Sequence, residues 1–180
     1  SADFSSMDAR YSDIKSGRAG GLLLQWGNFT LGGTFSVSSV LKNWAGESSC
    51  GLPFLIAADY EGGTVFSPAT LGLSLLPTNM MLAASGDEDA AAALAYLSGI
   101  ELKRAGINMD FAPVLDVNTN PKNPVIGTRA FSSNPALASR MGVAVVNGLK
   151  ASGVVAVAKH FPGHGAADAD SHETLPAINL

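Results

Sequence analysis

Four short apolar runs, separated by helical patterns, restrict the folds open to this chain. The runs are LLLQW at 22–26, PFLIAAD at 53–59, INMDFAPVLDV at 107–117 and VVAVAKHF at 154–161. Strands that are apolar on both faces are typical of a parallel sheet, because helices then cover it. Such strands in alternation with helices predict an α/β protein.

Helix signals fall between these runs, so that helices and strands alternate along the chain. The expected helices cover residues 7–17, 36–46, 85–106 and 134–153. The third has Ser85 as a candidate N-cap, acidic residues at its start and basic residues at its end. The fourth has Asn134 as a candidate cap, a proline in its first turn and Gly153 at its end.

Composition and charge exclude several classes of protein. The chain has 180 residues, of which 47% are hydrophobic, and a net charge of −4, so we expect one folded domain over residues 1–180 without a basic surface for nucleic acid. No apolar run approaches the roughly 20 residues that span a bilayer. The first ten residues lack the basic and apolar regions of a signal peptide. The single Cys50 excludes an internal disulfide and leaves the compartment open.

Polar residues lie at the ends of three of the four apolar runs. Asp59 ends the second run, Asp116 lies near the end of the third, and Lys159 and His160 lie near the end of the fourth. Ligands of α/β proteins bind beyond the carboxyl ends of parallel strands, so we expect these side chains to meet at a site. Either aspartate alone is equally consistent with a helix or turn cap.

All three histidines lie in the sequence KHFPGHGAADADSH at 159–172. Its proline and glycines predict a loop, and strand alternation predicts the side chains of Lys159 and His160 on opposite faces unless a bulge intervenes. Asp170 and His172 are two residues apart, which places both side chains on one face of an extended backbone. Asp170 would then fix the imidazole tautomer and raise its basicity, as proton transfer near neutral pH requires.

The residues alone leave three other interpretations of this loop open. The histidines could be hydrogen-bonded loop residues without chemistry. A zinc ion would find its donor atoms on His160, His164, His172 and either Asp168 or Asp170. A metal-dependent hydrolase is the weaker alternative, since Lys159 would repel a cation. A phosphate cradle around Lys159 is also conceivable, but neither G-x-x-x-x-G-K-[ST] nor G-x-G-x-x-G is present.

Three motifs together resemble the catalytic barrel domain of glycoside hydrolase family 3. They are D-x-E-G-G from Asp59 to Gly63, N-P-x-I-G-x-R-x-F from Asn123 to Phe131, and K-H-F-P-G-H-G…D-S-H…L-P from Lys159 to Pro176. The third is similar to the β-N-acetylhexosaminidase branch, and the similarity runs in register from about Gly20 to Pro176. The resemblance implies a (β/α)8 TIM-type barrel, no cofactor, and retaining hydrolysis of a terminal β-linked N-acetylglucosamine.

The resemblance assigns sugar binding to Asp59, Arg129, Lys159 and His160. A carboxylate accepts hydrogen bonds from sugar hydroxyls, while Arg and Lys donate to their oxygens, and such charge-assisted bonds are the stronger kind. Taken alone, Arg129 is equally consistent with a structural salt bridge. The expected partner is therefore a carbohydrate that ends in N-acetylglucosamine.

The resemblance assigns the general acid/base role to Asp170 and His172. Most retaining glycosidases use two carboxylates, and here an imidazole would replace one of them. The nucleophile that the resemblance implies is an aspartate in the loop after the seventh barrel strand, so we expect it downstream of Leu180.

The chain departs from the family pattern in three places. Ser67 stands where the first motif usually continues to an arginine, and Ala166 and Ala167 stand where Asp-Thr is common. A complete barrel takes about 250 residues, and the four strands expected here make about four βα units of a partial barrel. We expect these residues alone to be inactive, and their open sheet edges to favour self-association or pairing with the missing half. A non-catalytic sugar-binding or assembly fragment is the alternative.

Overall fold

The computed structural model describes residues 7–24, 30–48, 50–66, 72–176 and 178. Its central sheet contains β1 (Gly21–Leu24), β2 (Leu55–Ala58), β5 (Met109–Asp110) and β6 (Val155–Ala156). The strands lie in the order β1-β2-β5-β6, and each pair of neighbours is parallel. The predicted parallel α/β sheet is confirmed, and four sequential parallel strands fit an arc of a (β/α)8-type barrel.

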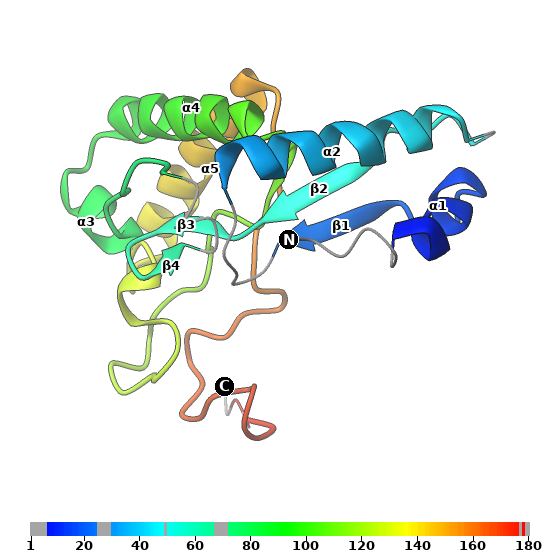
Figure 1. The fold of residues 1–180 in the computed structure, drawn as a ribbon. Helices are drawn as coiled ribbons and strands as arrows, with labels where there is room; N and C mark the ends of the chain where they lie inside the picture. The colour runs from blue at the N-terminus through cyan, green and yellow to red at the C-terminus, as the bar shows by residue number, and fades with distance from the viewer. Residues whose placement is uncertain (1–6, 25–29, 49, 67–71, 177, 179–180) are drawn as a thin grey trace.

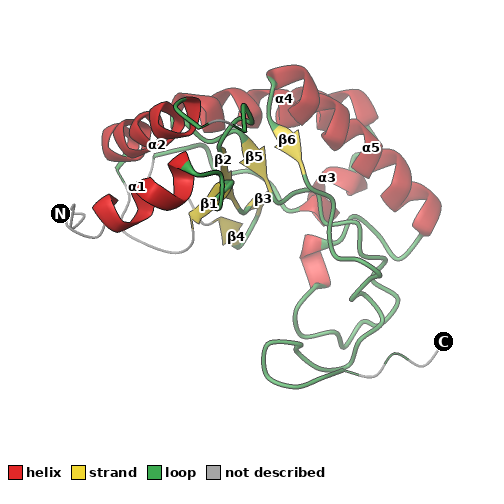
Figure 2. Cartoon of the chain, turned by 90° about the vertical axis from the view of Figure 1, so that its right-hand side faces the viewer, coloured by secondary structure: helices red, strands yellow, loops and turns green. Residues whose placement is uncertain are grey.

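Helices cover the outer side of this sheet. The described α-helices are α1 (Met7–Lys15), α2 (Leu31–Gly46), α3 (Asn79–Ala84), α4 (Glu88–Arg104) and α5 (Pro135–Ser152). Figure 2 shows α2, α4 and α5 as an outer arc, with the strands lining its inner side. Ile56, Leu102, Met141 and Leu149 are buried in the core between these layers. None of the described helices is long and apolar enough to cross a membrane.

The helix ends test the capping predictions. Asn134 caps α5 by accepting the backbone N–H groups of residues 136 and 137, and Gly153 ends it in the left-handed conformation, with φ of +82°, as predicted. The predicted start of the third helix at Ser85 is wrong. Asp87 is the N-cap of α4, because its carboxylate accepts the N–H of Ala90 at 2.8 Å, while Ser85 closes the short helix α3.

The third apolar run contributes much less strand than predicted. Of residues 107–117, only Met109–Asp110 join the sheet, and Val114 forms an isolated parallel bridge with Lys159. Pro113 lies between them and has no N–H to donate to a ladder. In the first run, residues 25 and 26 lie outside the described residues, as does Ser67.

A small hairpin after β2 was not predicted. Strand β3 (Tyr60–Gly62) pairs antiparallel with β4 (Val65–Phe66), so the DYEGG sequence forms regular structure and not only a polar strand end. The turn between the two strands, Gly63-Thr64, was the available signal. Figure 1 shows this hairpin directly after β2, at the carboxyl end of the sheet.

Candidate active site

The polar residues that follow the strands do meet. Asp59 follows β2, the loop from 111 to 134 follows β5, and the loop from 157 to 176 follows β6. Figure 1 shows both long loops leaving the sheet on the same side. The polar residues that follow β2, β5 and β6 therefore lie together at the carboxyl ends of the strands, where the sequence predicted a site.

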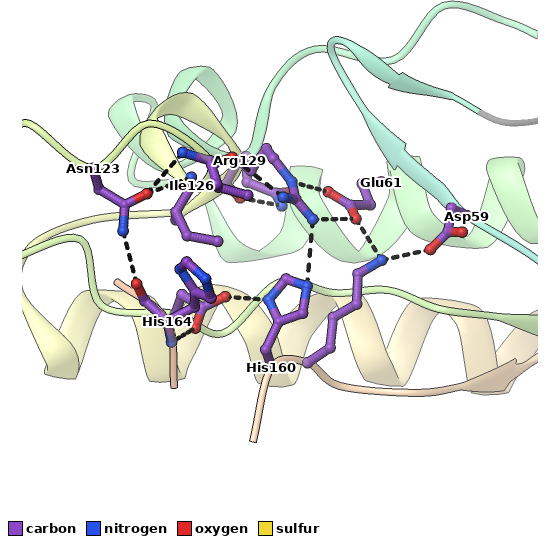
Figure 3. Close-up of polar contacts among 11 residues, drawn as sticks. Asp59, Glu61, Asn123, Ile126, Arg129, His160 and His164 are labelled. Carbon is purple, nitrogen blue, oxygen red and sulfur yellow. Dashed lines mark hydrogen bonds and ion pairs between the residues drawn. The ribbon is translucent and has the colours of Figure 1, made fainter. Parts of the chain in front are cut away.

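Glu61 is the centre of an ion-pair cluster at this place (Figure 3). Arg129 donates from Nε to Oε2 and from Nη2 to Oε1 of Glu61, both at 2.8 Å. The Lys159 ammonium lies 2.5 Å from Oε1 of Glu61 and 2.5 Å from Oδ1 of Asp59. Burial alone would lower the pKa of Arg129, but the ion pair with Glu61 raises it above its usual value. Two cations thus face two carboxylates, and their formal charges cancel.

His160 extends the cluster toward Asp116. Its Nδ1 lies 2.5 Å from Oδ2 of Asp116, and its Nε2 lies 3.4 Å from Nη2 of Arg129. Because a guanidinium only donates, the second contact favours a proton on Nδ1 that points at Asp116. Burial would raise the pKa of Asp116, but hydrogen bonds from the His160 ring and the His164 backbone outweigh it and lower that pKa.

The side chains of Lys159 and His160 enter the same cluster, so the prediction that they occupy opposite faces is wrong. Regular pairing of β6 ends at Ala156, and Lys159 keeps only its bridge to Val114. Strand alternation therefore no longer governs the direction of these side chains. The peptide bond between Lys159 and His160 is cis.

Asp110 lies beneath the cluster and is almost fully buried. Its Oδ1 accepts the backbone N–H of Tyr60 at 2.9 Å, which ties the end of β5 to the start of the hairpin. Burial raises the pKa of Asp110 well above its usual value, and the hydrogen bond from the Tyr60 backbone and the attraction of Lys159 only partly oppose this. A buried carboxyl of this kind tends to hold its proton.

Asparagine side chains hold the histidine loop against the loop that follows β5. Asn123 donates from Nδ2 to the carbonyl oxygens of His164 and Ala167, and Asn120 donates to Ala167. A Cβ at Gly165 would lie 2.0 Å from the carbonyl oxygen of Val117, so this close approach requires glycine. The ring of His164 stands edge-on to that of His160, and its two nitrogens are buried without a hydrogen-bond partner among the described residues.

Asp170 and His172 form a separate pair in the same loop. Oδ1 of Asp170 lies 2.7 Å from Nδ1 of His172 and also accepts its backbone N–H at 2.9 Å. The His172 side chain is 81% exposed. The structure therefore joins the two residues of the predicted acid/base pair to each other, and the hydrogen bonds within the described residues do not link them to the ion-pair cluster.

The cluster borders an open hollow of about 590 Å³. Asp116, Lys159 and His160 line it together with apolar residues that include Leu115 and Phe161. Its size falls in the range of about 300–1,000 Å³ typical of small-molecule sites. Within the described part of the chain, no three His, Cys, Asp or Glu side chains are arranged to hold a metal ion.

The structure thus gathers the four residues assigned to sugar binding into one hydrogen-bonded network. The sequence was equally consistent with a capping role for Asp59 and for Asp116. In the structure both carboxylates contact members of this network. Glu61 in the network, and Asp110 next to it, were not singled out from the sequence. Glu61 is part of the D-x-E-G-G motif, which could have indicated its role. Asp110 is part of an apolar run, where a charged residue was the one sign of a special role.

Almost the whole chain matches the model of a known family. Residues 3–180 match the model described as Glycosyl hydrolase family 3 N terminal domain. The chain belongs to glycosyl hydrolase family 3. Its relatives include Beta-hexosaminidase A of Pseudoalteromonas piscicida, 40% identical over 147 residues, and a Beta-hexosaminidase of Bordetella avium (strain 197N), 40% identical over 132 residues. These alignments cover 80% and 70% of this chain but only 25% and 37% of the relatives.

Solved family 3 structures share the fold. A β-N-acetylglucosaminidase from Paenibacillus sp. str. FPU-7 superposes with a TM-score of 0.85 and 40% identity, over 94% of this chain and 32% of that one. NagZ from Neisseria gonorrhoeae, solved in complex with N-trifluoroacetyl-D-glucosamine, superposes with a TM-score of 0.82 and 30% identity, over 94% of this chain and 50% of that one. The chain therefore spans about a third of the first of these structures and half of the second.

Proposed function

We propose that this chain carries the sugar-binding part of a retaining β-N-acetylhexosaminidase, which releases a terminal β-linked N-acetylglucosamine. The observation that carries the proposal is the network of Asp59, Lys159, Arg129 and His160 at the carboxyl ends of the strands. Relatives named beta-hexosaminidase, and a related structure that holds an N-acylglucosamine, support the same class of substrate.

The network has the chemistry that a sugar ring requires. Asp59, with a side chain 25% exposed, accepts from hydroxyl hydrogens, while Lys159 and Arg129 donate to hydroxyl oxygens. These groups are held against one another before the sugar arrives, so little order is lost on binding. The apolar part of the hollow would contact the carbon faces of the ring.

The proposed acid/base is His172, held by Asp170. The carboxylate fixes the proton on Nδ1 and stabilises the charged ring, which leaves Nε2 to donate to the glycosidic oxygen and later to accept from water. In a retaining mechanism a nucleophile attacks from the opposite face of the sugar. We place that nucleophile, an aspartate, downstream of Leu180.

The test uses the protein at its full natural length with an aryl β-N-acetylglucosaminide. We expect release of the aryl group, the β-anomer of the sugar as the first product by NMR, and no loss of rate with a chelator. Binding of N-acetylglucosamine without turnover would favour the non-catalytic sugar-binding module instead. Loss of activity with the chelator would favour the metal-dependent hydrolase.

A further inference from the structure

Glu61 differs from the other carboxylate that pairs with Lys159. The Asp59 side chain is 25% exposed and can meet a ligand, whereas that of Glu61 is 1% exposed. Both oxygens of Glu61 are already engaged, with three contacts to Arg129 and Lys159. A carboxylate whose acceptor sites point at two cations has little capacity left for a sugar hydroxyl.

We infer that Glu61 is a positioning residue, which holds Arg129 and Lys159 at a fixed spacing so that their remaining N–H groups meet the sugar together. This inference rests on the proposed function for the identity of the ligand. Glu61 itself touches no substrate in this scheme. It acts through the two cations, and its effect should appear in the affinity for the sugar.

The other contacts of Arg129 show why it depends on Glu61. Within the described residues, the guanidinium has one carboxylate partner, Glu61, and its remaining contacts are the Val125 carbonyl at 3.2 Å and the His160 ring at 3.4 Å. Lys159 would still have Asp59 if Glu61 were lost. Without the Glu61 carboxylate, the Arg129 guanidinium and the Lys159 ammonium would lie side by side with only Asp59 as a carboxylate partner. We then expect Arg129 to leave its present rotamer.

The hairpin fixes Glu61 on both sides. The preceding residue, Tyr60, donates its backbone N–H to Asp110, and its hydroxyl lies 2.5 Å from the Ser74 carbonyl oxygen and 3.1 Å from Oε2 of Glu101 in α4. The residue after Glu61, Gly62, has φ of +94°, and a Cβ there would lie 2.3 Å from the carbonyl oxygen of Pro77. The D-x-E-G-G motif thus combines a ligand-facing aspartate, a buried glutamate and a glycine that the close turn requires.

The experiment compares Glu61→Gln with a matched control, Glu101→Gln, in the protein at its full natural length. Gln has the shape of Glu but only one acceptor oxygen and no charge. The control removes a carboxylate that supports the same hairpin through Tyr60 and Ser74 without contacting either cation. Calorimetric titration with N-acetyl-D-glucosamine should show affinity at least 10-fold weaker for Glu61→Gln, and unchanged within a factor of two for the control.

A second measurement reports on Arg129 without any ligand. In ¹⁵N NMR spectra, assigned with Arg129→Lys, the Nε–H signal of Arg129 should be sharp and protected from exchange in the wild type and in Glu101→Gln. It should broaden or disappear in Glu61→Gln. If Glu61→Gln does not fold, Glu61→Asp takes its place, because the shorter carboxylate cannot reach both cations, and we expect about 10-fold weaker binding.

Three outcomes would overturn the inference. They are wild-type affinity in Glu61→Gln or Glu61→Asp, an equal loss of affinity in Glu101→Gln, and an unchanged Arg129 signal in the Glu61 variants. A wild-type protein that does not bind N-acetyl-D-glucosamine would instead count against the proposed function. The NMR comparison would still decide whether Glu61 holds Arg129.

Discussion

Asp170 contacts His172 through both its ring and its backbone, with Oδ1 of the aspartate 2.7 Å from Nδ1 and 2.9 Å from the backbone nitrogen. The backbone hydrogen bond first, and the ring contact second, lower the pKa of Asp170 below its usual value. Asp170 therefore stays ionised near neutral pH, and the proton it attracts lies on Nδ1. This arrangement suits a histidine whose Nε2 exchanges a proton with a substrate.

The first prediction concerns His172→Ala. If His172 protonates the leaving oxygen, turnover of substrates with poor leaving groups should fall by about 10²–10⁴-fold. Activated aryl glycosides need less acid assistance and should lose less. Steady-state kinetics on both substrate types give the comparison, and equal losses would contradict the general-acid role. Asp170→Asn should show a milder loss in the same direction and a shifted pH optimum.

The second prediction compares Asp59→Ala with Lys159→Ala. Each removes a partner of the sugar hydroxyls, so each should weaken N-acetylglucosamine binding by about 1–3 kcal/mol in calorimetric titrations. Asp59→Ala leaves Lys159 paired with Glu61, whereas Lys159→Ala removes the ammonium from two carboxylates at once. The melting temperature should therefore fall further in Lys159→Ala. Unfolding of both variants would show that the residues are structural.

The third prediction concerns Asp110→Asn and pH. Because the pKa of Asp110 is raised in the folded state, its stabilising contribution is complete below about pH 3.9, the value for an unfolded aspartate, and is lost as pH rises through the folded pKa. Between these two pKa values, the free energy of unfolding of the wild type should fall relative to that of the variant by at most about 1.4 kcal/mol per pH unit. Urea unfolding from pH 4.5 to 8 measures the difference. A difference independent of pH would refute the buried, protonated Asp110.

The fourth prediction compares His164→Phe with His160→Phe. The ring nitrogens of His164 are buried without a partner among the described residues, so an apolar ring should change the free energy of unfolding by less than about 1 kcal/mol. His160→Phe leaves the fully buried Asp116 without its ring partner and should cost about 2–3 kcal/mol. Urea unfolding measures both. If His164→Phe lowers the free energy of unfolding as much as His160→Phe does, the His164 ring has a hydrogen-bond partner and the prediction is wrong.

Local patterns in the sequence were enough to predict the elements and their order. The apolar runs mark all four sheet strands, and Asn134 and Gly153 mark the ends of α5, because burial and capping depend on residues close together in the chain. The same patterns misplaced the start of α4, where Asp87 and not Ser85 is the cap. They also overestimated the third strand, since an apolar run shows burial but not which of its residues pair in the sheet.

The position of Asp59 at a strand end, and the two-residue spacing of Asp170 and His172, were also determined by the sequence alone. Only the tertiary structure decided that Glu61 lies between Arg129 and Lys159, residues 68 and 98 positions away, and that His160 turns to Asp116. Such pairs depend on how parallel strands place distant loops side by side. Neither spacing nor propensity contains that information, because the free energy of an ion pair depends on distance in space and on burial.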